Sequence, residues 1–152
     1  MATSTPVVLG FTGTRRGSQS KQHKFLSTYL HTIWKTTDTV TIHHGDCIGW
    51  DTEFHKLCVS YDFNLIIHPP LNTRARAYNL DSGKPLVLMP VKPYIERNHD
   101  IVDACHELIA CPHSMEEVQR SGTWATIRYA KNVGKDVFII FPDGTTGHIK
   151  KG

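Results

Sequence analysis

The sequence predicts an α/β fold: a three-layer sandwich in which a mainly parallel sheet of about five strands is covered by helices on both faces. Short apolar runs rich in β-branched residues alternate along the chain with longer runs that place apolar residues at helical spacing. Strands that alternate with helices pair in parallel, through right-handed connections. Several of the short runs also end in loops that carry Gly, Thr, Asp or Arg, as expected where a ligand binds at the ends of strands.

The first part of the chain shows a strand–loop–helix pattern twice. Residues 6–11 predict a buried strand, and residues 19–34 predict an amphipathic helix after a glycine-rich turn. Residues 39–43 are again β-rich, and residues 51–61 again carry an apolar stripe at helical spacing. Strand, glycine loop and helix form the opening half of a nucleotide-binding βαβ unit. Glycine turns between strands and helices are also common for steric reasons alone.

The middle of the chain leaves the predicted sheet and returns to it. Residues 64–68 predict a third strand, which ends at residues 69–70 because two prolines there cannot continue the ladder of backbone hydrogen bonds. Residues 71–92 are irregular apart from a short edge strand within residues 86–89. A loop of this length is usually functional or mobile.

The last part of the chain completes the alternation. Residues 93–104 predict a helix that begins near a proline, and residues 108–111 predict a central strand. Residues 124–133 predict a helix ended by a glycine, and residues 137–141 predict the last strand. We expect residues 145–152 to form a flexible tail.

Length and composition describe one ordinary soluble domain. The 152 residues are 39% hydrophobic and 20% charged, and we assign residues 6–144 to the core of a single domain. No apolar run reaches membrane-spanning length, and residues 1–6 lack the features of a secretory signal. We therefore expect a cytoplasmic protein without a membrane partner.

The net charge and the metal-ligating residues indicate which classes of ligand the protein binds. The formal net charge of +3 allows an anionic small ligand but argues against nucleic acid. The four cysteines are scattered without a CxxC pair, which indicates reduced thiols. No recognised metal-ligand spacing occurs, so we expect neither a metal nor a cofactor. The side chains considered for a metal are His43, His44, Cys47, Cys111 and His113.

The loop after the first predicted strand offers groups for a phosphate. Gly13 and Gly17 permit a phosphate to approach the backbone closely. Thr12, Thr14 and Arg15 add hydroxyl and guanidinium donors.

The loop after the second predicted strand carries acidic residues. Asp46 stands where it can accept a hydrogen bond from a ribose hydroxyl or an amino group, or cap the loop itself. Asp51 lies in the first turn of the following helix, where a carboxylate suits the helix dipole.

The strongest anion signal lies at residues 120–126. Small residues leave backbone N–H groups uncovered where a helix begins, just after a buried strand, and such a helix start suits a phosphate or carboxylate. Arg120 precedes it and can grip the same anion. A plain N-cap by Ser121 or Thr123 is the alternative.

The carboxyl ends of parallel strands meet at one sheet edge, so we expect these loops to converge on one ligand site there. The predicted ligand-binding residues are Thr12, Gly13, Thr14, Arg15, His44, Gly45, Asp46, His68, Arg97, Arg120, Ser121, Gly122, Thr123 and Trp124.

As an ordered set, these motifs resemble the SLOG superfamily of Rossmann-like domains, named for the DNA-processing protein Smf/DprA and the LOG phosphoribohydrolases. The matching segments are residues 10–15, 44–51, 97–102, 120–124 and 137–144, and the resemblance runs from about residue 7 to residue 144. It implies a stand-alone, single-domain member that binds nucleotides or nucleotide-derived ligands, or single-stranded DNA as in the DprA branch. It also implies self-association into a homo-oligomer.

One departure from the LOG hydrolases bears on catalysis. The resemblance places Thr126 where those enzymes carry a catalytic glutamate, although Arg97 resembles the arginine that pairs with it. Cleavage of an N-glycosidic bond needs a carboxylate, and Asp46, Asp51 and Glu96 are the candidates.

The sequence therefore favours a protein that binds a nucleotide, a cyclic nucleotide or oligonucleotide, or an ADP-ribose-type signal. Such a protein can sequester its ligand as an antagonist of nucleotide-signalled immunity. The alternative is an N-glycosidase (phosphoribohydrolase) or a nucleoside deoxyribosyltransferase acting on a nucleoside monophosphate. Single-stranded DNA binding is a weaker alternative.

Overall fold

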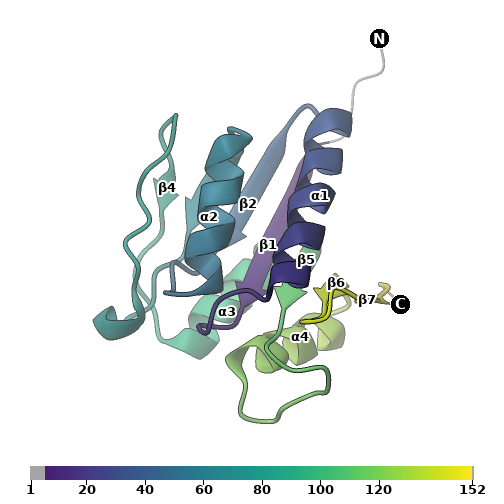
Figure 1. The fold of residues 1–152 in the computed structure, drawn as a ribbon. Coiled ribbons are helices and arrows are strands. Elements are labelled where there is room, and N and C mark those ends of the chain that lie inside the picture. Colours follow the sequence, from purple (N-terminus) through teal and green to yellow (C-terminus); the bar gives the residue numbers. More distant parts are fainter. Residues whose placement is uncertain (1–5, 152) are drawn as a thin grey trace.

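The computed structural model describes residues 6–151 and contains one seven-stranded sheet, in the order β4-β3-β2-β1-β5-β6-β7 (Figure 1). All neighbouring strands pair in parallel except β6 and β7, which are antiparallel. The strands are β1 (Val7–Gly13), β2 (Val40–His44), β3 (Asn64–Ile67), β4 (Val87–Leu88), β5 (Glu107–Cys111), β6 (Asp136–Ile140) and β7 (Thr146–Ile149).

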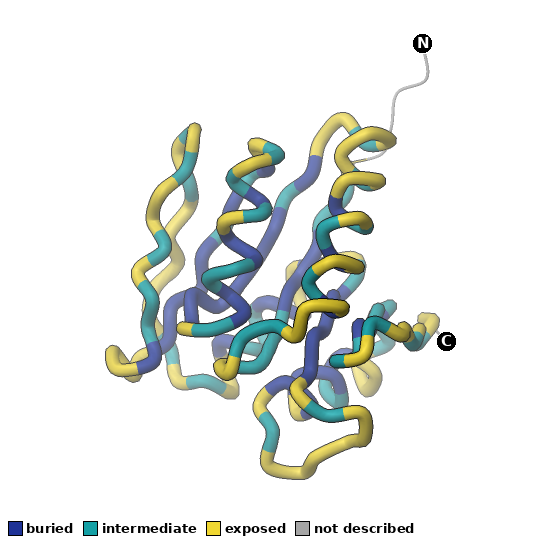
Figure 2. Tube along the Cα trace, viewed as in Figure 1, coloured by how far each residue is buried: buried dark blue, intermediate teal, exposed yellow. Residues whose placement is uncertain are grey.

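Two helices cover each face of the sheet (Figure 1). On one face, α1 (Ser20–Thr36) and α2 (Trp50–Ser60) bury apolar side chains against β1, β2 and β3. On the other face, α3 (Tyr94–Ala104) and α4 (Gly122–Asn132) pack on β5 and β6. Figure 2 shows the buried strands between helices whose outer turns are exposed. A single 3₁₀ turn, η1 (Thr73–Ala75), interrupts the connection from β3 to β4.

Aromatic packing fixes the α2 side of the sheet. Phe11 on β1 stacks on Phe54 of α2, with ring centroids 4.0 Å apart, and meets Trp50 edge-on at 5.6 Å. All three side chains are buried, and burying one such side chain stabilises the fold by about 1.5–3 kcal/mol. The loop between β1 and α1 is thereby held against the start of α2.

A buried glutamine ties α1 to the strand ends. Gln22 donates through Nε2 to the carbonyl oxygens of Pro112 (3.0 Å) and Ile140 (2.8 Å). Its Oε1 accepts from the indole nitrogen of Trp50 at 2.7 Å. Because a buried amide must satisfy its hydrogen bonds, this one side chain fixes the ends of β5 and β6 and the start of α2 together.

The predicted fold class is confirmed: the sheet is mainly parallel and helices cover both faces. The expected edge strand is present as β4. The strand count is higher than the predicted five, and the expectation of a flexible tail is wrong for residues 146–149. These residues form β7 because a tight turn, in which Asp143 Oδ1 accepts from the Thr145 amide at 2.9 Å, folds them back onto β6. Residues 1–5, which belong to the segment that lacks signal features, and Gly152, the last residue of the predicted tail, lie outside the described residues.

The strand order creates a crevice at one edge of the sheet. From β1 the chain moves outward to β2, β3 and β4, and then returns through α3 to β5 on the other side of β1. The loops after β1 and β5 therefore leave the sheet in opposite directions, which is the switch point where open α/β sheets bind ligands. No helix within residues 6–151 is long and apolar enough to span a membrane.

Candidate functional site

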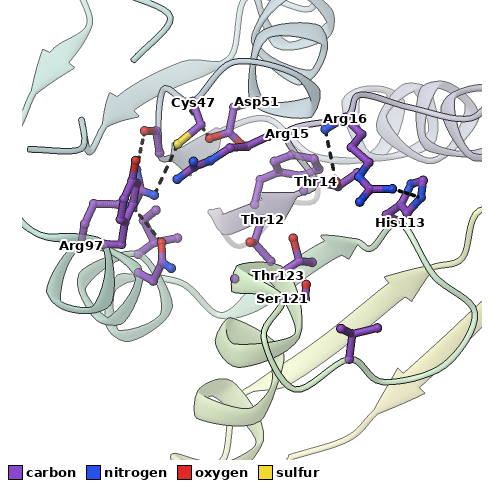
Figure 3. Close-up of a pocket in the computed structure, with 18 of the residues that line it drawn as sticks. Thr12, Thr14, Arg15, Arg16, Cys47, Asp51, Arg97, His113, Ser121 and Thr123 are labelled. Carbon is purple, nitrogen blue, oxygen red and sulfur yellow. Dashed lines mark hydrogen bonds between the residues drawn. The ribbon is translucent and has the colours of Figure 1, made fainter. Parts of the chain in front are cut away.

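A pocket of about 640 Å³ lies at the carboxyl ends of β1 and β5 (Figure 3). Its wall comes from the end of β1, from the loops after β1, β2 and β5, and from the N-terminal parts of α2, α3 and α4. Ten of the predicted ligand-binding residues line it, so the expected convergence is present at this edge. They are Thr12, Gly13, Thr14, Arg15, Gly45, Arg97, Arg120, Ser121, Gly122 and Thr123.

The start of α4 presents backbone donors to this pocket. Ser121 caps the helix, its Oγ accepting from the Trp124 amide at 3.2 Å. Gly122 and Thr123 occupy the first helical positions, where amides have no partner inside the helix, and both line the pocket. A Cβ added to Gly122 would meet nothing within 4 Å, so the absence of a side chain keeps this part of the pocket open. The predicted N-cap and the predicted anion site are therefore compatible.

Guanidinium groups surround the pocket mouth. Arg120 is exposed and has no hydrogen-bond or ion-pair partner within residues 6–151. Arg16 reaches from the β1 loop to the β5 loop, where its Nη1 lies 2.8 Å from His113 Nε2 (Figure 3). Because a guanidinium only donates, this histidine nitrogen accepts. Arg15 stacks on the ring of Tyr94, 4.6 Å from its centroid.

Tyr94 contributes an unsatisfied polar group to the wall. Its hydroxyl is buried and has no hydrogen-bond partner among the described residues. Leaving such a group unpaired costs about 1–3 kcal/mol. A ligand atom that accepts or donates at this hydroxyl recovers that free energy.

Arg97 holds the strand ends together. Its side chain is 5% exposed, and its Nη1 donates to the carbonyl oxygens of Gly45 (2.5 Å) and His68 (3.1 Å). Its Nε donates to Asn98 Oδ1 at 2.7 Å, and its Nη2 lies 3.5 Å from Cys47 Sγ. Arg97 lines the pocket as predicted, but nearly all its donors are used within the protein.

Asp51 is the only one of the three candidate catalytic carboxylates that lines the pocket. Its Oδ2 accepts from the Cys47 amide at 3.0 Å. Burial raises the pKa of Asp51 to about 6, while the nearby charge of Arg97 opposes that rise. Glu96 is exposed on α3 and lies outside the pocket wall.

Asp46 does not face the pocket, contrary to the predicted ribose contact. Its carboxylate is fully buried and accepts from the Asn79 amide (2.8 Å) and from Arg76 Nε (3.3 Å). Of the two alternatives for Asp46, the structure shows the loop-holding one, because both oxygens are taken by the segment that follows η1.

His44 and His68 are also buried behind the pocket wall rather than in it. His44 Nε2 lies 2.9 Å from His55 Nδ1, and its Nδ1 accepts from the Asp46 amide. His68 Nε2 lies 2.8 Å from His43 Nδ1. Burial lowers the pKa of His44 well below its usual value and that of His68 to about 4. His44 and His68 each pair with another buried histidine, which is why they are not available to a ligand.

Two residues of α4 point into the helix packing instead of the pocket. Trp124 is buried beside Phe141, and its indole nitrogen donates to Ser114 Oγ at 3.1 Å. Thr126 is buried, and its Oγ1 donates to the Gly122 carbonyl oxygen at 2.8 Å. The position that the resemblance aligns with a catalytic glutamate is therefore a hydroxyl bound to its own helix.

The sequence did not single out several lining residues. Arg16 follows Arg15, so its only signal was its position next to a predicted residue. Tyr94, His113 and Ser114 follow no recognised motif, and they line the pocket because of how the loops fold. Within residues 6–151, no group of three or more His, Cys, Asp and Glu side chains is arranged to hold a metal ion.

Comparison with known proteins finds similarity in structure alone. No family model and no curated protein sequence matches the chain. DNA processing protein A (DprA) from Streptococcus pneumoniae matches with a TM-score of 0.66 and 19% identity, over 88% of this chain and 50% of that one. This chain shares its fold with DprA. DprA from Helicobacter pylori, described for its single-stranded DNA binding mode, matches with a TM-score of 0.62 and 18% identity, over 89% of this chain and 65% of that one.

The similarity agrees, at the level of the fold, with the resemblance to the SLOG superfamily, although the chain spans only 50% and 65% of the two DprA chains. It also corrects the argument against nucleic acid. That expectation is wrong, because a protein of this fold is described as binding single-stranded DNA. The formal charge of +3 averages over the whole chain, whereas Arg15, Arg16 and Arg120 gather at one pocket.

Proposed function

We propose that this pocket binds a nucleotide unit through a phosphate group held at the start of α4. The observation that carries the proposal is that the Gly122 and Thr123 amides meet Arg120 in one pocket, and that Arg120 has no partner within residues 6–151. Helix N-termini favour anions because their amides are free and their dipole is positive, and a guanidinium adds charge-assisted hydrogen bonds. The position at the strand switch point supports the same assignment.

The rest of the pocket suits a sugar and a base. Its volume of about 640 Å³ falls within the usual range of small-molecule sites. Thr12, Thr14 and the Tyr94 hydroxyl offer hydrogen bonds, while Ile101 and Val118 offer apolar surface. The proposed ligands are a nucleotide, a cyclic nucleotide or an ADP-ribose-type molecule, which the protein binds intact and sequesters.

Isothermal titration with a nucleoside monophosphate and its matching nucleoside tests the phosphate assignment. We expect measurable binding of the monophosphate and at least a ten-fold weaker affinity for the nucleoside, because charge-assisted hydrogen bonds are lost. Heating the complex should release the ligand intact. Equal affinities for the two ligands would overturn the proposal.

Single-stranded DNA is the second candidate, favoured by the fold shared with a DprA described as binding it. In this case the pocket holds one nucleotide of a longer strand. The affinity for an oligothymidylate should then fall steeply as salt rises, because phosphate contacts release counterions. Binding that does not depend on salt would exclude this candidate.

The N-glycosidase alternative rests on Asp51 alone among the predicted carboxylates, since this side chain lines the pocket and its pKa is raised to about 6. A protonated carboxyl can act as a general acid toward a leaving base. Incubation with nucleoside monophosphates should then release free base, and the Asp51→Asn variant should release none while keeping its affinity. Absence of free base with the unchanged protein would exclude the alternative.

A further inference from the structure

The segment after η1 holds an aromatic side chain in an unusual conformation. Tyr78 has a φ of +58°, in the left-handed region, and its side chain is 53% exposed. A residue with a Cβ adopts this region at a cost in free energy, and persists in it only where the surrounding structure holds it there. Such strain at an exposed aromatic residue calls for a functional explanation.

Hydrogen bonds to Asp46 hold Tyr78 in this conformation. The amides on either side of Tyr78 are both fixed to it: Ala77 N donates to the Asp46 carbonyl oxygen at 2.8 Å, and Asn79 N donates to Asp46 Oδ1 at 2.8 Å. Asn79 Nδ2 also donates to Thr52 Oγ1 at 3.1 Å. Since Asp46 is itself buried and left-handed, with a φ of +53°, the two strained residues form one rigid unit.

Arg76 covers one side of the tyrosine ring. Its guanidinium lies 4.3 Å from the ring centroid of Tyr78, and its Nε is bound to Asp46 Oδ2 at 3.3 Å. The ring is thus backed by a fixed cation while much of its surface remains open to solvent. This is the geometry of an aromatic platform on which another flat ring can stack.

The platform lies next to the proposed phosphate pocket. Arg76 pairs with Cys47 in an antiparallel bridge, and Cys47 lines the pocket. The backbones of two bridged residues are about 5 Å apart. The Ile48 amide, which donates to the Ala75 carbonyl oxygen at 2.9 Å, joins the pocket loop to the same segment.

We propose that Tyr78 stacks on the base of a second nucleotide, so that the ligand of this sheet edge is a single strand of at least two nucleotides. The proposal rests on the proposed function, because the pocket must hold the phosphate of the first nucleotide. Stacking on a tyrosine ring does not depend on which base is present, so the platform gives affinity without sequence preference. The fixed arginine behind the ring adds positive charge beside the strand.

The test compares thymidylate with an oligothymidylate, each titrated against the unchanged protein and the Tyr78→Asn variant. Asparagine accepts the left-handed backbone, so this variant removes the ring without adding strain. We expect its affinity for the oligothymidylate to fall about ten-fold, and its affinity for thymidylate to stay the same. Tyr78→Phe keeps the ring and should bind both ligands as the unchanged protein does.

Trp34→Ala is the matched control. Trp34 is 50% exposed near the end of α1, at the opposite edge of the sheet, and its removal should leave both affinities unchanged. Equal oligothymidylate affinities for the unchanged protein and Tyr78→Asn would overturn the stacking role. A loss that appears with a cyclic dinucleotide but not with the linear strand would overturn the assignment of a strand. Failure of the unchanged protein to bind either thymidylate or the oligothymidylate would instead refute the proposed function.

Discussion

The two sides of the pocket use similar polar residues for different purposes. On the side of β2 and α3, Arg97 has its donors committed to Gly45, His68 and Asn98. On the side of α4, Arg120 and the amides of Gly122 and Thr123 have no partner within residues 6–151. The first side is a framework that holds the strand ends, and the second is the surface left available to a ligand.

The glycines show the same division. A Cβ on Gly13 would lie 2.6 Å from Trp50 Cβ, and one on Gly45 would lie 2.7 Å from Arg97 Cζ, so the fold itself excludes side chains there. Gly49 has a φ of +88°, which few other residues adopt. Gly122 has open space around it and no left-handed backbone. Of these four glycines, only Gly122 is required neither by packing nor by its backbone conformation, so its lack of a side chain is available to the ligand site alone.

Replacing Arg97 gives the largest effect that we predict. Arg97→Met should lower the free energy of unfolding by about 3–5 kcal/mol, because the buried carbonyl oxygens of Gly45 and His68 lose their charged donor. Urea denaturation measures the loss. Arg120→Met is the control, because it makes the same substitution at an exposed arginine. If Arg97→Met is as stable as the control and loses only ligand affinity, the framework role is wrong.

The second-largest effect that we predict is a loss of stability in acid, which arises on the framework side of the pocket. The pKa values of His43, His44 and His68 are lowered by burial, that of His68 to about 4, so the unfolded chain binds protons that the folded protein excludes. Their stabilising contribution is complete above about pH 6.5, their usual pKa, and is lost as the pH falls toward 4. Asp51 acts in the opposite sense, because its raised pKa of about 6 favours the folded protein at low pH.

We expect the effect of the histidines to exceed that of Asp51, so that the free energy of unfolding falls by about 2 kcal/mol between pH 6.5 and 4. Urea denaturation at a series of pH values measures it. The free energy of unfolding of the His68→Gln variant should fall less over the same interval, because glutamine binds no proton in the unfolded chain. An equal loss in both proteins would contradict a contribution from His68.

Replacing Arg120 should affect the ligand side without affecting stability. Arg120→Gln should bind a nucleoside monophosphate about ten- to a hundred-fold more weakly, because a charge-assisted contact is lost. Its melting temperature should be unchanged, since Arg120 has no partner among the described residues. Arg74→Gln, which replaces another exposed arginine outside the pocket wall, is the control. Equal losses in the two variants would indicate a general charge effect instead of a site.

The smallest predicted effect comes from filling the open space at Gly122. Gly122→Ala should keep or slightly raise the melting temperature, because alanine favours a helix and its Cβ meets nothing within 4 Å. It should weaken the binding of the monophosphate by a few-fold, because the added methyl group narrows the pocket where the phosphate lies. Unchanged affinity would place the phosphate away from the start of α4.

The sequence predicted the elements and the edge of the sheet where the pocket lies, because apolar periodicity and glycine loops are local signals. It did not predict which polar side chains face the pocket. Asp46 and His68 follow strands just as Thr12 does, but their partners, Asn79, Arg76 and His43, lie on other elements. Strand β7 was missed for a similar reason, since Thr146–Ile149 has little apolar pattern and depends on pairing with β6.

Amide chemical shifts during a titration with thymidylate test the division of the pocket most directly. We predict that the largest proton and nitrogen shifts occur at Gly122 and Thr123, the amides left free at the start of α4. The amides of Gly45 and Cys47, on the framework side, should shift much less. Shifts that are largest at Gly45 and Cys47, with the Gly122 and Thr123 signals unchanged, would show that the phosphate does not bind at the start of α4.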